Sequence, residues 1–381
     1  MSEPADHVDA LASAERHATN LELFLDLVFV FAVTQIASLI SRHPSGTGTA
    51  KGLLMAILVW WQWSQFAWTG SAVDLQRETR TRILVLCLIP VTLIMAISIP
   101  NAFHGDAIWF GAAYLGVQTV VIAALGMYAM VDEATRRGYW RYASVASFAP
   151  ALVFGGAFAH DNARVMVWTL AALVNFVGAL RAGGGDWIIS PVHFAERHAL
   201  FVIIALGEVL VTAGASATET GLRRHIAIAI VVSVMVACTV WWAYFAFIPE
   251  VGEQALRQRT GAARGRLARD LYTFGHFPLV FGIILYAVVV KHLVPSPEGH
   301  LSIDDRWLLA LSFGAFVGGL AATQLRVVRK VAPERLLAIP VVALWCVAGA
   351  RMPGVVTVGG VAVAYAAMQA VTLRRLWGKE P

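Results

Sequence analysis

The sequence has little charge for its length. Only 14% of the 381 residues are charged, whereas 58% are hydrophobic and the mean hydropathy is +0.68. Soluble globular chains carry about 25% charged residues, so the composition excludes an ordinary soluble protein. Cysteine is scarce as well. Cys87, Cys238 and Cys346 all lie in apolar stretches without metal-ligand spacing, which favours small packing residues over a metal centre.

Motifs of soluble chemistry are also missing. The chain has no His-Glu-x-x-His, no Gly-x-Ser-x-Gly and no P-loop, and no polar segment is large enough to bind a nucleotide. We therefore expect no enzyme, no cofactor and no metal site. The net charge of +5 fits basic loops that face anionic lipid. The expected partners are thus membrane lipids and an ion or small solute, with no nucleic acid and no signal for an oligomeric state.

What the sequence does contain is twelve apolar stretches, separated by charged residues or by Pro and Gly. A helix needs roughly 20 mainly apolar residues to cross a bilayer. The sequence therefore predicts an all-α integral membrane protein with about twelve transmembrane helices. The predicted spans are 21–40, 53–70, 83–99, 107–130, 140–158, 165–180, 200–214, 226–247, 271–290, 307–325, 336–349 and 355–373.

The basic residues indicate how these spans are oriented. Twelve crossings place both termini and every second loop on one side, and 21 of the 29 Lys and Arg residues fall on that side. Because cytoplasmic loops are enriched in Lys and Arg, both termini are predicted to be cytoplasmic, in a multi-pass protein of the cytoplasmic (inner) membrane. Residues 1–20 hold four acidic residues and a single Arg, which indicates that the first span is a permanent anchor and not a cleaved signal.

Two short sequence motifs each occur twice in the chain, with the same number of residues between their copies. Ala14-Glu15-Arg16-His17 returns as Ala195-Glu196-Arg197-His198, and Trp60-Trp61 returns as Trp241-Trp242, both 181 residues later. The recurrence predicts two six-helix repeats. An even number of spans inserts both repeats the same way up, with a central seam between their first spans. The predicted segments are a cytoplasmic N-terminal segment 1–20, a first repeat 21–182, a linker and start of the second repeat 183–198, the rest of that repeat 199–374, and a cytoplasmic tail 375–381.

Acidic residues interrupt the first span of each repeat. Glu22 and Asp26 lie four residues apart on one helical face, with Thr34 roughly in line, and Glu208 precedes Thr212 by one turn in the seventh span. At the helical rise, Asp26 lies about 8 Å and Glu208 about 12 Å inside the cytoplasmic ends of their predicted spans. A carboxylate at such a depth costs at least about 3 kcal/mol unless it is paired, protonated or hydrated. These acids must therefore face the protein interior or water.

Three interpretations of these acids are open. They are structural, bonded to Arg16, Arg197, His17 or His198 near the span entrances. Alternatively, they line an ion or proton pathway in which the hydroxyls of Thr34 and Thr212 act as ligands. Glu196, in the second copy of the Ala-Glu-Arg-His motif, would be a supporting residue. Intramembrane hydrolysis or group transfer is the third. The tryptophan-rich segment around Gln62, with Trp63 beside it, indicates helix packing and an interfacial aromatic belt.

Two longer sequence motifs are distinctive enough to suggest a family. The run from Glu22 to Gln35, Glu-Leu-Phe-Leu-Asp-Leu-Val-Phe-Val-Phe-Ala-Val-Thr-Gln, is followed in the second half by Glu-Arg-His-Ala-Leu-Phe-Val-Ile-Ile-Ala-Leu-Gly-Glu, from Glu196 to Glu208. With both motifs in this order, the whole chain resembles the bacterial low-temperature-requirement protein A family. The resemblance implies a multi-pass inner-membrane protein. The family name refers to a growth phenotype and implies no substrate.

A second resemblance concerns the first helix alone. The segment Phe24-Leu25-Asp26-Leu27-Val28-Phe29 is similar to the Phe-Ser-Asp signature of a two-repeat potassium-channel family, in which the first helices line the pore. Asp26 matches the signature acid, Leu25 replaces its serine, and the second half lacks a Phe-x-Asp triplet. The function we expect is transport of an ion or small solute along the seam. The alternative is a membrane scaffold or envelope-stress factor that transports nothing.

Overall fold

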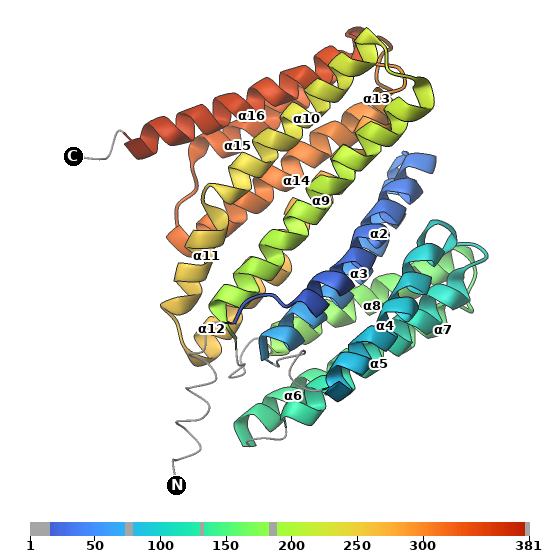
Figure 1. Ribbon diagram of the computed structural model, residues 1–381, viewed down its shortest axis with the longest axis vertical. Coiled ribbons are helices and arrows are strands. Elements are labelled where there is room, and N and C mark those ends of the chain that lie inside the picture. Colours follow the sequence, from blue (N-terminus) through green and yellow to red (C-terminus); the bar gives the residue numbers. More distant parts are fainter. Residues whose placement is uncertain (1–15, 73–78, 130–132, 183–188, 378–381) are drawn as a thin grey trace. The chain divides into compact units, whose positions relative to one another are not determined.

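The computed structural model describes residues 16–72, 79–129, 133–182 and 189–377, and every regular element in these ranges is helical (Figure 1). Parts of the predicted N-terminal segment, linker and tail, namely residues 1–15, 183–188 and 378–381, lie outside the described residues. The long helices are α2 (Asn20–Arg42), α3 (Gly46–Ala72), α4 (Thr79–Ser98), α5 (Ala107–Ala129), α8 (Asp161–Ala182), α9 (Pro191–Thr220), α10 (Arg224–Phe245), α13 (His276–Leu293), α14 (Ile303–Val328), α15 (Pro333–Ala348) and α16 (Gly354–Trp377). The shorter helices are α6 (Glu133–Ala146), α7 (Phe148–Gly156), α11 (Ile248–Arg257) and α12 (Gly261–Ala268).

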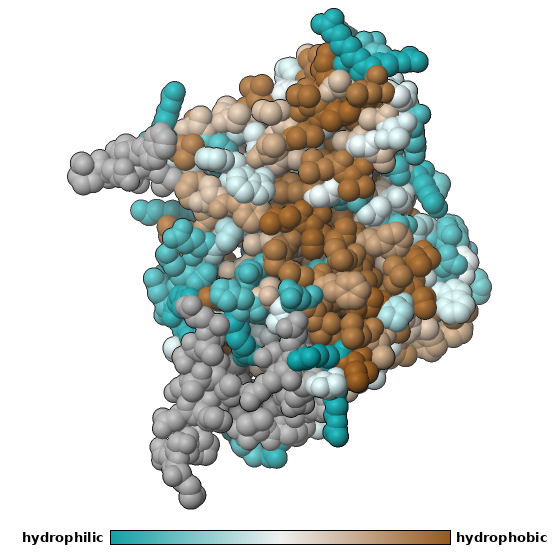
Figure 2. Space-filling model, viewed as in Figure 1, coloured by the Kyte–Doolittle hydropathy of each residue, from teal (hydrophilic) through white to brown (hydrophobic). Residues whose placement is uncertain are grey.

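The exposed sides of the long helices are apolar. Leu27, Met166 and Val363 are 60%, 71% and 69% exposed on α2, α8 and α16, although each is a large hydrophobic residue. Figure 2 shows hydrophobic residues over the sides of the helices and hydrophilic residues near many of their ends. Within the described ranges, ten helical segments are long and apolar enough to cross a membrane. The all-α membrane class that the sequence predicts is therefore confirmed.

Two of the twelve predicted spans are not among these ten. The second span corresponds to α3, which has 27 residues but whose Trp, Gln and Ser side chains lower its hydropathy. The fifth span is broken near Ser147 into α6 and α7, and its apolar part is the short segment Tyr142–Gly156. Ten candidate crossings are thus observed, while twelve crossings and the two repeats stay predictions.

The chain forms two compact units, and neither is continuous in sequence. The first comprises residues 1–36, 53–200 and 252–273, so it includes the N-terminal parts of α2 and α9. Within it, α3 is the most enclosed helix, since all but two of residues 54–71 are buried. Helices α4, α5, α7, α8 and α6 pack against one another in that order.

The second unit comprises residues 37–52, 201–251 and 274–381. Its most enclosed helix is α13, in which 14 of 18 residues are buried, as expected of a helix that is apolar all round. Gly282 lets α13 approach α14 closely, because a Cβ there would lie 2.7 Å from the carbonyl oxygen of Ser312. Helix α14 also packs on α15, and α16 packs on both α10 and α15.

Candidate functional site

The candidate site begins at the first turn of α2. Thr19 precedes the helix and Glu22 follows three residues later, which is the spacing of a capping box. The backbone N–H and the hydroxyl of Thr19 each donate to Glu22 Oε2 over 2.9 Å, and the hydroxyl oxygen accepts from the N–H of Glu22 over 3.3 Å. The local sequence therefore fixes the Glu22 carboxylate at the start of the helix.

The other side of this carboxylate faces α9. His193 Nε2 lies 2.9 and 3.1 Å from the two oxygens of Glu22, and both side chains are almost completely buried. Gly70 of α3 closes the pocket around the pair, since a Cβ at position 70 would collide with Glu22 Oε1. The second ring nitrogen, Nδ1, is buried and makes no hydrogen bond to the residues that the structure describes. Because a carboxylate only accepts hydrogen bonds, Nε2 carries the ring N–H toward Glu22, and Nδ1 is left with a lone pair.

One turn further along, Asp26 forms an ion pair with Arg197. Arg197 donates from one terminal nitrogen to Asp26 Oδ1 over 2.9 Å, and its other terminal nitrogen lies 2.9 Å from Oδ2. Trp63 of α3 donates its indole N–H to the same Oδ1 over 2.9 Å. The Arg197 guanidinium also lies 5.9 Å from the Trp63 ring centre, a cation–π distance. Since Arg197 and Trp63 are 0% exposed and Asp26 is 1% exposed, this cluster is shielded from solvent.

The two pairs show how the N-terminal parts of α2 and α9 are arranged. Glu22 and Asp26 are separated by four residues, as are His193 and Arg197, and both pairs join residues 171 apart in the chain. A constant offset over successive turns requires that these parts of α2 and α9 run side by side in the same direction. The helices α2 and α9, which contain the first and seventh predicted spans, thus meet through buried polar pairs near their N-terminal ends.

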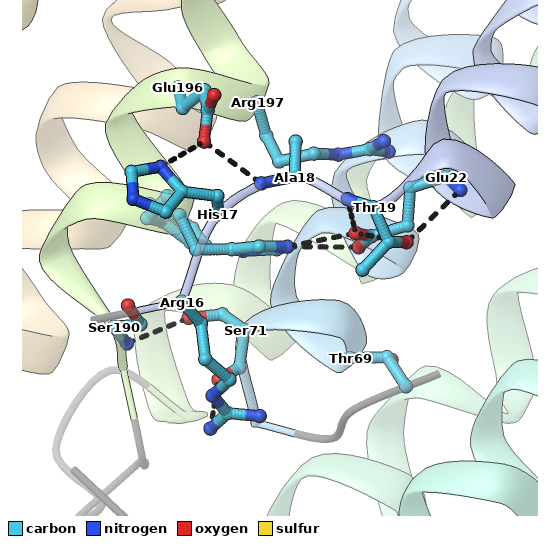
Figure 3. A network of polar contacts seen from close by, with 12 residues as sticks. Arg16, His17, Ala18, Thr19, Glu22, Thr69, Ser71, Ser190, Glu196 and Arg197 are labelled. Atoms are coloured by element: carbon cyan, nitrogen blue, oxygen red, sulfur yellow. Dashed lines mark hydrogen bonds and ion pairs between the residues drawn. The ribbon is translucent and has the colours of Figure 1, made fainter. Parts of the chain in front are cut away.

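A more exposed network holds the chain that enters α2 (Figure 3). Glu196 Oε2 accepts the backbone N–H of Ala18 over 2.8 Å and lies 3.3 Å from His17 Nδ1. Arg16 donates to the carbonyl oxygen of Ser71, whose hydroxyl accepts the N–H of Ser190. These contacts of Arg16, His17 and Glu196 therefore tie the start of α2 to the C-terminal end of α3 and the N-terminal part of α9.

His198 lies in an aromatic setting. Its Nδ1 donates to the carbonyl oxygen of Phe194 over 2.8 Å, and its ring packs edge-on against Trp63 with 4.9 Å between ring centres. Tyr272 packs against the same ring at 4.8 Å. The two copies of the Ala-Glu-Arg-His motif contain four basic residues, and Arg197 is the one whose side chain reaches Asp26.

In the second unit, Glu208 is buried at 4% exposure and accepts a 2.9 Å hydrogen bond from the Thr212 hydroxyl one turn later. In the first unit, Thr34 donates to the carbonyl oxygen of Val30 in its own helix. A small cavity inside the second unit borders α9 at Leu206, and the hydroxyl-bearing residues Tyr286, Ser312 and Tyr365 are among its otherwise mainly apolar lining residues. No group of three His, Cys, Asp or Glu side chains in the described ranges is placed to hold a metal ion.

Sequence reasoning missed two residues of this site. No motif marks His193, but it precedes Arg197 by four residues just as Glu22 precedes Asp26, and these matching spacings are the signal for paired helix faces. The sequence predicts a packing and belt role for Trp63, whereas its indole N–H binds the Asp26 carboxylate. The hydrogen-bonding need of a buried indole was the signal for this contact.

Comparison with known proteins places the chain in a family. The profile of the bacterial low temperature requirement A protein matches residues 17–371. An uncharacterized protein of Rhizobium meliloti (strain 1021) is 30% identical over 279 residues, which cover 70% of this chain and 67% of that protein. No solved structure matches the chain. The matched region contains the capping box, the Glu22–His193 and Asp26–Arg197 pairs and Glu208, and the chain belongs to the bacterial low temperature requirement A family.

Proposed function

We propose that this protein transports an ion or small solute across the membrane, and that α9 carries the charged groups of the pathway. The observation behind the proposal is the distribution of buried ionisable residues on that one helix. His193, Arg197 and Glu208 are all buried, and they spread over about 22 Å of a helix at 1.5 Å per residue. That length is most of a hydrocarbon core of about 30 Å. Ionisable groups inside membrane helices are costly and typically mark ion or proton pathways.

These residues have different roles in the proposed pathway. Asp26 and Arg197 neutralise each other and hold the helices, because they form an ion pair that is shielded from solvent. Glu22 and His193 are the pair we assign to proton exchange, since the second imidazole nitrogen makes no hydrogen bond to the part of the chain that the structure describes. Glu208 is the acid deeper in α9, with the Thr212 hydroxyl beside it, and Thr34 offers a hydroxyl on α2. This mechanism needs no cofactor and no catalytic step at these acids.

Flux through purified protein in lipid vesicles tests the proposal. Vesicles loaded with potassium and a pH-sensitive dye report cation and proton movement when a potential is applied. Glu208→Gln keeps an oxygen that accepts from Thr212 but removes the charge, so we expect flux to fall at least about 10-fold with unfolding temperature unchanged. Glu219→Gln is the matched control, because Glu219 is exposed near the end of the same helix. Equal flux through wild type and Glu208→Gln would remove Glu208 from the pathway.

A membrane scaffold is the second candidate, and the Asp26–Arg197–Trp63 cluster favours it. A buried, mutually paired ion pair with an indole donor can serve packing alone. In that case wild-type vesicles would show no flux above empty ones for any ion tested, while substitutions in the cluster would lower stability. The same set of measurements therefore separates the two functions.

We further propose that α3 and the α6–α7 segment also cross the membrane, which completes twelve crossings in two parallel repeats. Helix α3 has 27 residues, more than the roughly 20 that a crossing needs, and its polar side chains are buried inside its unit. The parallel course of the α2 and α9 starts supports repeats that insert the same way up. Twelve crossings would put both termini in the cytoplasm, and the basic loops would fix this orientation in the inner membrane.

A further inference from the structure

A serine, a histidine and an aspartate meet in the second unit, away from the acids discussed above. The Ser41 hydroxyl lies 2.9 Å from His292 Nε2, and His292 Nδ1 lies 2.5 Å from Asp305 Oδ1. The second carboxylate oxygen of Asp305 accepts a 2.7 Å hydrogen bond from the Ser302 hydroxyl. The three functional side chains come from three different helices, the end of α2, the end of α13 and the start of α14.

The order of contacts decides the protonation of the imidazole. A carboxylate on Nδ1 accepts the ring N–H, which leaves Nε2 with a lone pair toward Ser41. Ser41 is then the donor, and its proton points at a base that the carboxylate holds in position. This is the arrangement that activates the nucleophile in serine hydrolases, where it is recognised by geometry and not by sequence order.

Local structure holds the carboxylate rigidly. Ser302 is the N-cap of α14 and accepts the backbone N–H of Asp305 over 3.0 Å, so Asp305 occupies the third position of a capped helix. The Asp305 side chain is 10% exposed and that of His292 is 26% exposed, while Ser41 is half-buried. The base and the serine can therefore be reached from outside, whereas the aspartate is sheltered.

The position along the spans suggests the substrate class. Ser41 is the penultimate residue of α2, His292 is the penultimate residue of α13, and Asp305 is the third residue of α14. Ends of membrane-spanning helices lie at the interface between hydrocarbon and water, which is where the ester groups of lipids are found. Carboxylic esters, from a lipid or from a small molecule at the interface, are the compounds that would meet this serine.

We propose that Ser41 is the nucleophile, His292 the general base and Asp305 the positioning residue of a site that cleaves carboxylic esters. Ser41 Oγ attacks the ester carbonyl carbon as His292 Nε2 takes the hydroxyl proton. The C–O bond to the alcohol then breaks, and the alcohol leaves with the proton from His292. Water cleaves the acyl-serine by the same route, which releases the acid and restores Ser41. The inference departs from our sequence-based expectation of no enzyme, because these residues belong to no hydrolase motif.

Covalent labelling of the purified full-length protein tests the nucleophile directly. A fluorophosphonate probe forms a bond from serine Oγ to phosphorus and expels fluoride, and mass spectrometry locates the modified residue. We expect labelling at Ser41 and at least a roughly 100-fold slower reaction in His292→Gln. Ser45→Ala is the matched control, since Ser45 is exposed in the turn that follows α2 and contacts Thr47 and not His292. Its labelling should match wild type.

The carboxylate requires a separate readout, because its loss could also loosen α14. Asp305→Asn keeps the shape but removes the charge, and Asp305→Glu restores the charge. Labelling that is lost in Asp305→Asn and recovered in Asp305→Glu supports a positioning role. Folded wild-type protein that is not labelled at Ser41, or that is labelled equally fast without His292, overturns the proposal and leaves a hydrogen-bonded contact between helices.

Two substrates identify the source of the ester. A water-soluble nitrophenyl ester and vesicles of a phosphatidylglycerol with a labelled acyl chain are each offered to wild type and to Ser41→Ala. Release of the labelled fatty acid that depends on Ser41 assigns a lipid ester, while hydrolysis of the nitrophenyl ester alone assigns a soluble one. Turnover of neither by labelled protein overturns the ester-cleaving role. The flux assay on Glu208→Gln is independent of this outcome.

Discussion

At the level of single residues, Asp26 is the acid that binds the Arg197 guanidinium directly, with its two oxygens 2.9 Å from the two terminal nitrogens. Asp26→Asn would leave a cation that is 0% exposed without that partner, although the amide oxygen could still accept from Trp63. Breaking a buried pair from one side typically costs 3–5 kcal/mol, so we expect destabilisation of about 4 kcal/mol. Thermal unfolding of the purified protein in detergent measures the effect.

Glu196→Gln is the control for this prediction. The Glu196 side chain is 38% exposed, and the amide oxygen of Gln can still accept the N–H of Ala18. Loss of its ion pair with His17 should cost less than about 1 kcal/mol. If Asp26→Asn unfolds at the same temperature as Glu196→Gln, the buried pair does not stabilise the fold as we describe.

The same residues show what the sequence can reveal about a site. Glu22, Asp26 and Glu208 stand out because an acid in an apolar span is costly, and all three are buried. Their partners are harder to predict, since a partner is set by the rotation of one helix against another. Arg197 was one of four basic candidates for Asp26, and His193 escaped notice because a single histidine near a span entrance is unremarkable without the packing of α9 on α2.

At the level of helices, Gly70 controls how closely α3 approaches the Glu22–His193 pair. A Cβ at position 70 would overlap Glu22 Oε1 and would lie 3.3 Å from His193 Cε1, and these two side chains are held in place by their mutual hydrogen bond. We expect Gly70→Ala to destabilise the protein by about 2 kcal/mol, as overpacking of a rigid core usually does. Gly318→Ala in α14 has open space around its Cβ and should be neutral or slightly stabilising. Unfolding temperatures of the two variants that agree would contradict this account.

Arg164 joins segments of the first unit through backbone groups. Its terminal nitrogens donate to the carbonyl oxygens of Ala102 and His104, which precede α5, and to those of Ala157 and Ala159, which follow α7. Arg164→Lys keeps the charge but replaces a planar fork by a single ammonium group, which cannot reach all four oxygens. We expect a loss of about 2 kcal/mol in unfolding free energy. Arg223→Lys, at an exposed position, should change nothing measurable.

The identity of a helix is easier to predict than its surroundings. The spans 226–247 and 307–325 lie within a few residues of α10 and α14, because apolar runs with charged ends mark membrane helices clearly. The span 200–214 is shorter than α9, which begins at Pro191, since the buried charges from His193 to His198 resemble a loop in a hydropathy profile. Hydropathy assumes that polar residues face water, and that assumption fails where they face each other.

At the scale of the whole molecule, the number of crossings determines which side each loop occupies. With twelve crossings, the loop at Gly105 and the turn at Leu222 lie on the same side. If α3 and α6–α7 do not cross, the two loops lose different numbers of preceding crossings. One crossing is lost before Gly105 and two before Leu222, so the two positions then lie on opposite sides.

Cysteine labelling decides between these topologies. Gly105→Cys and Leu222→Cys are each placed in a background whose three native cysteines are replaced by alanine, and intact cells are treated with a membrane-impermeant maleimide. Both positions are exposed, and Gly105 has open space for a side chain. Twelve crossings predict that both are labelled from outside, because the loops rich in Lys and Arg face the cytoplasm. Gln258→Cys, in a basic loop that is cytoplasmic under either count, should be labelled only after the cells are permeabilised. Labelling of Leu222→Cys but not of Gly105→Cys in intact cells would show ten crossings, and the parallel six-helix repeats would have to be abandoned.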